Sequence, residues 1–378
     1  MRKTINIGDL GTIITGKTPP TTNKNYYGDY AVFIKPTDIS EQSKYTYETE
    51  EMYSKLAAEK YESSLIPKGA ICVPCIGTIG TKMTMTPCDC YTNQSINSII
   101  CNENYDNEYV YYLIKNFLPG LKAYNLGTAS GREYVSKSNF EKIELVAEQD
   151  QEIQKKIGII LSRYDSLIEN YQKQIKLLEE AAQRLYKEWF VDLRFPGHEN
   201  TKIVDGVPEG WTPSQLGQLA EFKRGKTITK KDVIDGDIPV VAGGLEPAYY
   251  CNKSNTAERV ITISGSGANA GFTRMYFEKV WASDCSFVDA SVTPFLHFVY
   301  CYLKANKTTI DNMQKGAAQP HVYAKDINSL SICIPIESVL KSFEGTASKY
   351  FDTISSFQSQ IHLLTEARDR LLPKLMSG

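Results

Sequence analysis

The sequence predicts an α+β protein built from two copies of one unit, and three observations support this fold class. Each half of the chain contains short β-branched runs broken by Gly, Pro, Asn and Asp, which are typical of strands joined by loops. Each half then ends in an apolar heptad pattern, which is typical of a helix that pairs with another helix. Finally, the two halves match each other in sequence. We therefore expect two globular domains with mixed or antiparallel sheets, separated by two long helices.

The internal repeat is visible in register at several places. GKT at 16–18 falls on GKT at 225–227 at a shift of 209 residues, and TNQSIN at 92–97 falls on SDCSFV at 283–288. Tyr134 and Ile143 fall on Tyr323 and Ile332 at a shift of 189. The clearest match places QIKLLEEAAQRL on QIHLLTEARDRL at a shift of 186. Because solenoid repeats are only about 20–50 residues long, this repeat indicates a domain duplication.

Each copy ends in an apolar seam with alternating spacings of four and three residues. The first seam is Ile157, Leu161, Tyr164, Ile168, Tyr171, Ile175, Leu178, Ala182, Leu185 and Trp189. The second is Phe343, Ala347, Tyr350, Ile354, Phe357, Ile361, Leu364, Arg368, Leu371 and Leu375, where only Arg368 breaks the pattern. Two matched seams predict that the helices pair with each other. If a pseudo-two-fold axis relates the copies, the pair is an antiparallel intramolecular coiled coil.

These patterns divide the chain into four expected segments. They are a first globular domain at 1–148, a helix at 149–195, a second globular domain at 196–335 and a second helix at 336–378. The clear helical stretches within the globular domains are EYVYYLIKNFL and FLHFVYCYLK.

Composition limits the class of protein. The chain has 42 Lys and Arg residues against 44 Asp and Glu, a formal charge of −2, so it is not a nonspecific nucleic-acid coater. No apolar run is long enough for a membrane span, and no signal peptide is visible. The nine cysteines are scattered, which favours reduced thiols over a disulfide framework. We therefore expect a cytoplasmic protein.

The stretch GTIITGKT at 11–18 matches the pattern of a phosphate-binding loop. Such a loop requires a helix that starts at the Lys-Thr pair, but Pro19 and Pro20 follow directly and disfavour helical backbone before them. The second copy also lacks the first glycine. The sequence therefore argues against ATP binding and favours a basic turn instead.

Other chemical motifs are weak. The cysteines at 72, 75, 88 and 90 have nearly a zinc spacing, but positions 72 and 75 of a strand face opposite sides. The matching positions of the second copy are Thr262 and Gly265. A nuclease-like pattern that ends at Glu221 and Lys223 is also not repeated. We expect no metal, no cofactor and no catalytic residues.

The arrangement resembles the specificity subunit of type I restriction-modification systems. RLYKEWFVDLRFP at 184–196 is similar to the central conserved region of that family, and VPEGWTPSQLGQLAEFKRGK at 207–226 is similar to the start of its second target recognition domain. GTIGTK at 77–82 is similar to a glycine turn of these domains. The first copy departs from the family's Gly-x-x-Gln-Pro form, because it reads GTASGR at 127–132 where the second reads GAAQPH at 316–321.

The resemblance implies that each globular domain reads one half of a gapped double-stranded DNA site. It also implies that the helix pair sets the spacing and docks two copies of a DNA adenine methyltransferase, and it leaves open whether ATP-dependent restriction or translocase subunits bind too. The DNA-binding residues that follow from the repeat are Lys17, Lys35, Thr78, Lys82, Asn93, Arg132, Arg224, Lys226, Ser266, Asn269, Arg274, Gln319 and His321. For each of them a structural role competes with DNA contact, and Asn93 in particular is a natural turn former.

The main alternative is a coiled-coil adaptor whose globular domains bind protein without recognising DNA. The heptad seams fit both functions. The duplicated basic turn favours DNA, whereas the balanced charge favours the adaptor.

Overall fold

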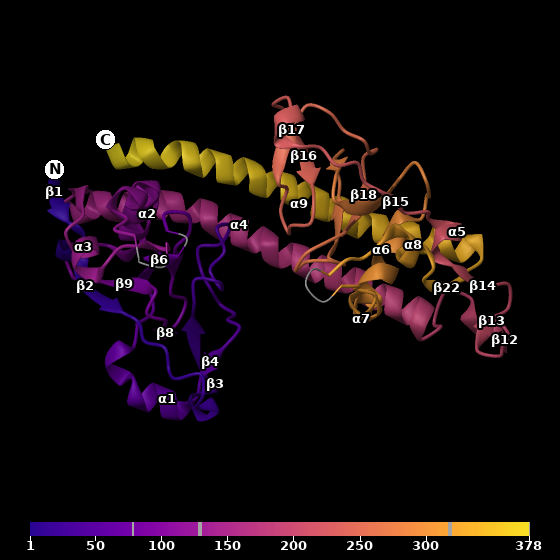
Figure 1. The fold of residues 1–378 in the computed structure, drawn as a ribbon, viewed down its shortest axis with the longest axis horizontal. Coiled ribbons are helices and arrows are strands. Elements are labelled where there is room, and N and C mark those ends of the chain that lie inside the picture. The colour runs from indigo at the N-terminus through magenta and orange to yellow at the C-terminus, as the bar shows by residue number, and fades with distance from the viewer. Residues whose placement is uncertain (78, 128–130, 317–319, 378) are drawn as a thin grey trace. The chain divides into compact units, whose positions relative to one another are not determined.

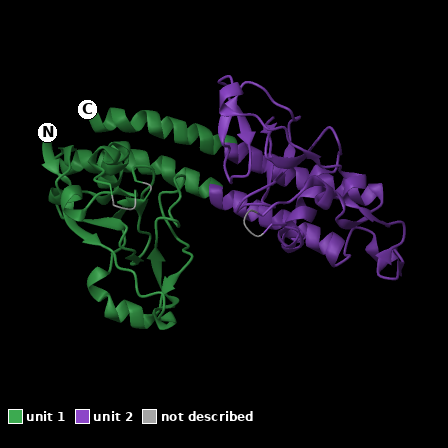
Figure 2. Ribbon diagram, in the orientation of Figure 1, with its two compact units in different colours: residues 1–171, 359–378 green, residues 172–358 purple. Residues whose placement is uncertain are grey.

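A computed structural model describes residues 1–77, 79–127, 131–316 and 320–377 of the chain. Thr78 and Gln319, which the sequence analysis names as DNA-binding residues, lie outside the described residues. The chain forms two compact units, shown in different colours in Figure 2. Unit 1 combines residues 1–171 with residues 359–378, and unit 2 contains residues 172–358. The start and the end of the chain therefore belong to the same unit.

Unit 1 is an α+β domain with mixed sheets (Figure 1). Its strands are β1 (Arg2–Asn6), β2 (Gly11–Thr15), β3 (Tyr27–Ile34), β4 (Met52–Tyr53), β5 (Ile71–Pro74), β6 (Ile76–Gly77), β7 (Thr84–Met85), β8 (Tyr91–Thr92), β9 (Ile96–Cys101), β10 (Glu133–Tyr134) and β11 (Glu144–Glu148). An antiparallel sheet has the order β2-β9-β5-β7, and a second sheet, β4-β3-β8, contains a parallel pair. Strands β1 and β11 form an antiparallel pair, as do β6 and β10.

Unit 2 repeats this architecture. Its strands are β12 (Ile203–Val204), β13 (Val207–Pro208), β14 (Thr212–Gln215), β15 (Lys223–Arg224), β16 (Ile238–Val241), β17 (Tyr249–Cys251), β18 (Val260–Ser264), β19 (Thr273–Tyr276), β20 (Trp281–Ala282), β21 (Cys285–Asp289) and β22 (Ser331–Ile334). The sheet β15-β21-β18-β19 matches β2-β9-β5-β7, and β17-β16-β20 matches β4-β3-β8 down to its parallel pair. Strands β14 and β22 pair as β1 and β11 do. The predicted duplication and the predicted mixed sheets are confirmed.

Two helices of unit 1, α2 and α3, have counterparts in α6 and α8 of unit 2. Unit 1 contains α1 (Lys55–Lys60), α2 (Asn107–Phe117) and α3 (Lys137–Glu141), and unit 2 contains α5 (Leu216–Leu219), α6 (Leu296–Ala305), α7 (Lys307–Asn312) and α8 (Ala324–Asn328). Helix α2 is capped by the Asp106 side chain, which accepts a hydrogen bond from the Tyr109 backbone N–H. It lies in the core of unit 1, just as α6 lies in the core of unit 2.

The two long helices are α4 (Gln151–Tyr186) and α9 (Glu337–Ser377), and each belongs to both units. Helix α4 ends in a π-helical turn, η5 (Lys187–Val191), and α9 continues through Pro373. In unit 1 the core contains Ile157 and Leu161 from the start of α4 together with Leu372 and Met376 from the end of α9. In unit 2 the end of α4 shares a core with the start of α9. Within each unit the helices therefore run antiparallel, as the seams predict.

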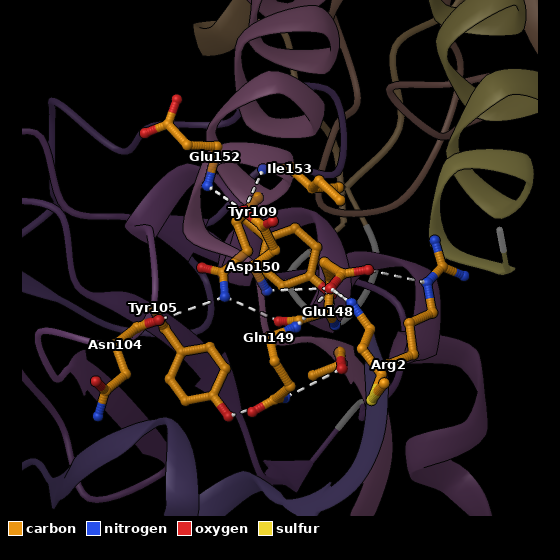
Figure 3. A network of polar contacts seen from close by, with 12 residues as sticks. Arg2, Asn104, Tyr105, Tyr109, Glu148, Gln149, Asp150, Glu152 and Ile153 are labelled. Carbon is orange, nitrogen blue, oxygen red and sulfur yellow. Dashed lines mark hydrogen bonds and ion pairs between the residues drawn. The ribbon is translucent and has the colours of Figure 1, made fainter.

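The junction between β11 and α4 fixes the helix pair to the domain of unit 1 (Figure 3). Asp150 caps α4 by accepting a hydrogen bond from the Glu152 backbone N–H at 2.8 Å. The Arg2 guanidinium donates to the carbonyl oxygens of Leu375 and Met376 at 2.8 and 2.5 Å. These are carbonyl groups of the last turn of α9, which have no partner within the helix. One residue of β1 thus holds the end of α9.

The structure corrects the register of the repeat in its second half. The pairing of Asn6 with Glu144 corresponds to that of Gln215 with Ser331, so the shift there is 187 rather than the predicted 189. As a result, Ile143 matches Leu330 instead of Ile332. The cause is small differences in loop length, which an alignment of isolated motifs does not detect.

Among the described residues, none of the helices is long and apolar enough to cross a membrane. Within the same residues no group of three or more His, Cys, Asp or Glu side chains is placed to hold a metal ion. Burial raises the pKa of the Cys72 and Cys75 thiols to about 12.

Candidate nucleic-acid interface

The two Gly-Lys-Thr turns, residues 16–18 and 225–227, occupy equivalent places in the two units. Each turn follows the first strand of the four-stranded sheet and packs against the loop that leads into the second strand of that sheet. We call these the facing loops: residues 92–95 in unit 1 and 282–284 in unit 2. The first five residues of the phosphate-loop pattern form strand β2, and no helix follows either turn directly.

The backbone of both turns is held by the same pair of hydrogen bonds. In unit 1 the Lys17 N–H donates to the Thr92 carbonyl oxygen at 2.9 Å, and the Gly16 N–H donates to Ile96 at 3.3 Å. In unit 2 the Lys226 N–H donates to the Ala282 carbonyl oxygen at 2.9 Å. These amide groups are therefore unavailable to cradle a phosphate.

The turn glycines are required by this close approach. A Cβ atom on Gly16 would overlap the carbonyl oxygen of Thr92, and a Cβ atom on Gly225 would overlap those of Ala282 and Ser283. The carbonyl oxygen of the lysine that follows each glycine accepts a hydrogen bond from an aromatic side chain. Tyr53 Oη donates to Lys17 at 2.5 Å in unit 1, and Trp281 Nε1 donates to Lys226 at 2.7 Å in unit 2. Both lysines are exposed at the tip of a rigid turn.

The side chains around this shared backbone differ between the units. In unit 2 the Asp284 carboxylate accepts hydrogen bonds from the Arg224 guanidinium and from the Ser266 hydroxyl. Gly265 makes room for the guanidinium, because a Cβ atom there would overlap it. His321 forms a β-bridge with Ser266, and its ring stacks on Tyr323. The structure thus brings together the predicted residues Arg224, Ser266 and His321.

Unit 1 has neutral side chains at the corresponding place. The hydroxyl group of Thr15, which occupies the position of Arg224, donates to Asn97 Oδ1 at 2.6 Å. The Thr18 hydroxyl pairs with the Gln94 side chain. The Asn93 carboxamide oxygen accepts a hydrogen bond from the Ser95 backbone N–H at 3.1 Å, which is a turn-forming contact. The two units therefore present different polar groups on one backbone frame.

The remaining predicted residues lie apart from the turns. Lys35 forms ion pairs with Glu50 and Glu51 at 2.8 and 3.3 Å. Burial opposes its charge, but these two carboxylates outweigh that effect and raise the pKa of Lys35. Lys82 is half-buried in the loop before β7, and Arg132 is exposed directly before β10.

In unit 2, the Asn269 carbonyl oxygen accepts a hydrogen bond from the Phe272 backbone N–H. Arg274 on β19 donates to the Leu245 carbonyl oxygen at 2.8 Å and pairs with Glu246 at 3.2 Å. It also lines a pocket with Tyr300 and Lys304. These contacts engage Arg274 within the unit.

The sequence motifs do not predict Asp284, Gln94 and Asn97 as residues of the site. The alignment of TNQSIN with SDCSFV is wrong by one or two residues, because the facing loop of unit 1 is one residue longer than that of unit 2. Thr92 and Ala282 are equivalent, since each accepts from the lysine N–H, and Ile96 and Cys285 are equivalent, since each accepts from the glycine N–H. The signal that could have located the facing loops is the polar residues that directly follow the short strands β8 and β20.

Comparison with known proteins identifies the family. Residues 2–180 and 208–369 match the model of the type I restriction modification DNA specificity domain. The chain belongs to this family. It is a DNA-recognition subunit of the type I restriction-modification class, in which the specificity subunit is not the catalytic component.

Two relatives and one solved structure illustrate the similarity. The MjaIX specificity subunit of Methanocaldococcus jannaschii is 28% identical over 399 residues, which cover 98% of this chain and 92% of the relative. The HindI specificity subunit of Haemophilus influenzae is 37% identical over 163 residues, 42% of this chain and 35% of the relative. The S subunit from M. genitalium has the same fold, with a TM-score of 0.60 at 17% identity over 100% of this chain and 96% of that one. The family favours DNA recognition over the coiled-coil adaptor.

Proposed function

We propose that each unit of this specificity subunit reads one half of a split double-stranded DNA site and that α4 and α9 set the spacing between the halves. The observation that carries the proposal is the duplicated Gly-Lys-Thr turn, with one backbone frame and two different sets of polar side chains. A shared frame suits a common approach to the DNA backbone, and different side chains suit different bases. The proposed domain division is 1–148, 149–195, 196–335 and 336–378.

Lys17 and Lys226 are the proposed phosphate contacts at the tips of the turns. Phosphate contacts fix the position of a protein on DNA without reading its sequence. In unit 2, Arg224 is the proposed base reader, because Asp284 holds its guanidinium, Ser266 in turn holds Asp284, and an arginine reads guanine in the major groove. The remaining predicted residues stay candidates for DNA contact: Lys35, Thr78, Lys82, Asn93, Arg132, Ser266, Asn269, Arg274, Gln319 and His321.

The partner surface we propose is a stripe on the part of α4 that belongs to unit 1. Ile153, Ile160 and Leu167 are spaced by seven residues, which places them on one face of the helix. They are 39%, 41% and 45% exposed, respectively. An exposed apolar stripe of this kind suits a protein partner. We assign it to a DNA adenine methyltransferase subunit, of which two copies would bind one chain, in an enzyme that works in the cytoplasm.

The experiment that tests the DNA proposal measures affinity as a function of salt concentration for Lys17→Ala and Lys226→Ala. Each substitution should weaken binding to all DNA sequences about equally and reduce the salt slope by about one. Lys341→Ala is the matched control, because Lys341 on α9 pairs with Glu337 and lies outside both turns. Unchanged affinity and salt slope in both turn variants would remove the turns from the DNA interface.

A further inference from the structure

A buried ion pair joins the two long helices within unit 1. Asp165 on α4 and Arg368 on α9 form this pair, and their side chains are each 7% exposed. The second carboxylate oxygen of Asp165 accepts a hydrogen bond from the Tyr112 hydroxyl of α2. Arg368 Nε also donates to Asp369 Oδ1 at 2.8 Å. The one polar break in the seam is therefore a fully partnered charge.

Unit 2 has no charge at the equivalent positions. The shift of 186 residues that aligns the helices places Phe351 on Asp165 and Arg368 on Ala182. Phe351 and Ala182 are buried, at 2% and 0% exposure, in the apolar core of unit 2. The Phe351 ring packs against Tyr300 of α6 with centroids 5.6 Å apart. One unit thus has an ion pair where the other has an aromatic side chain, which packs on Tyr300 and stacks on the His297 ring.

Half of the ten seam positions carry the same residue in both helices. The five identical pairs are Tyr164 and Tyr350, Ile168 and Ile354, Ile175 and Ile361, Leu178 and Leu364, and Leu185 and Leu371. Apolar contacts carry little information about which helix is the partner, because they are not directional. With respect to these positions, α4 would pair with a second copy of α4 as readily as with α9.

We propose that the Asp165–Arg368 pair selects the helix partner. It favours pairing of α4, in the first half of the chain, with α9, in the second half, over pairing of α4 with α4 or of α9 with α9. In an antiparallel pair of two α4 helices, Asp165 would face Ala182 of the second copy and lose its cation. In a pair of two α9 helices, Arg368 would face Phe351, lose the buried Asp165 carboxylate and keep only the exposed Asp369 carboxylate of its own helix. A charge that is buried without its counter-ion is strongly disfavoured. A single polar residue at a seam position, as Arg368 is, is also a known way to select a helix partner.

The selection matters because the two halves carry different recognition groups. Pairing of unlike halves always combines the first globular segment with the second, whereas pairing of like halves would give molecules with two identical segments. The proposal concerns how the chain assembles, so it does not depend on which residues contact DNA.

The experiment uses the full chain with a protease site inserted at Gly197, where a side chain would meet open space. The chain is folded first and then cleaved, which leaves two fragments joined by non-covalent contacts. Isotope-labelled and unlabelled cleaved chains are mixed in urea below the unfolding midpoint, so that fragments exchange, and the pairs are weighed by native mass spectrometry. Wild-type fragments should exchange and form unlike pairs, with like pairs only a small fraction of the total.

The test variant is Asp165→Leu with Arg368→Leu, which makes the seam apolar in both units. Like pairs should increase at least tenfold relative to wild type, which corresponds to about 1.4 kcal/mol of lost selectivity. Equal fractions of like pairs in the variant and the wild type would overturn the proposal. If this variant does not fold, Asp165→Asn with Arg368→Gln removes the charges while keeping polar groups, and the same increase is expected.

The matched control is Arg259→Gln with Asp352→Asn. This pair links the second globular segment to α9 within one half of the chain, at 2.6 Å, and its side chains are 41% and 54% exposed. Exposed ion pairs contribute little, so its removal should leave the fraction of like pairs at the wild-type value. An increase equal to that of the seam variant would show that loss of any ion pair loosens the assembly, which also contradicts the proposal.

Discussion

At the scale of single residues, Gly16 and Gly225 show how one residue type fixes the geometry of a site. Each lies where the turn passes directly over a carbonyl group of the facing loop, so a methyl group has no space. The lysine at the tip owes its position to this contact and to the hydrogen bond from its own N–H group. The residue that shapes the site is therefore not the residue that we propose to contact DNA.

Substitution of either glycine by alanine should destabilise its unit. Because the neighbouring atoms are backbone, the Cβ atom forces the turn away from the facing loop, at a cost of about 1–3 kcal/mol. Gly345→Ala is the control, since this residue of α9 has open space around it. Alanine favours helix over glycine by about 1 kcal/mol, so that variant should be more stable. Urea unfolding curves measure all three, and no loss of stability in Gly16→Ala would contradict the close approach.

At the scale of elements, α4 has two faces with different functions. Ile168 is 3% exposed on the buried face, whereas Ile160 is 41% exposed on the face that we assign to the partner. Both lie in the part of the helix that belongs to unit 1. The same helix thus supports the fold through one side and offers an apolar stripe on the other.

Substituting aspartate for Ile168 on the buried face, or for Ile160 on the exposed face, tests the structural role and the binding role of α4 separately. Ile168→Asp buries a charge without a partner and should cost about 3–5 kcal/mol of unfolding free energy. Ile160→Asp lies on the surface and should change stability by less than about 0.5 kcal/mol, but it should weaken capture of the methyltransferase. Thermal unfolding and co-purification are the measurements. Full methyltransferase binding by a folded Ile160→Asp variant would exclude this stripe as the docking surface.

The helices and the duplication were predictable from the sequence because heptad spacing and repeated motifs depend only on order along the chain. The sequence also located Arg368 as the break in the seam, but not its partner, because Asp165 lies outside the seam pattern. Likewise, the GKT motif could be recognised in the sequence, but the facing loop that packs against it could not be predicted. Its contacts join residues some 60–80 positions apart, and the loops differ in length. Asp284 was missed for this reason.

At the scale of the whole molecule, the two units use the same strand order and different polar side chains. Each unit contains a complete Gly-Lys-Thr turn with its own facing loop. Recognition by one unit should therefore change without altering recognition by the other.

Arg224→Ala should relax base preference in one half of the DNA site and leave the other half unchanged. The substitution removes the guanidinium that Asp284 holds, and loss of a base contact by such a group costs about 1–3 kcal/mol of discrimination. Selection of bound sequences from a randomised DNA pool measures both halves at once. Relaxed preference in both halves, or in neither, would contradict the assignment of Arg224.

The most direct test of the central claim is a genome-wide map of methylated adenines in host cells with and without this gene. We predict that one split motif, two short unlike halves around a fixed gap, is methylated only when the gene is present. A chain with Arg224→Ala should restore methylation at sites that vary in one half alone. Identical maps with and without the gene, in cells whose methyltransferase subunit is active, would contradict the claim that this chain selects the DNA site.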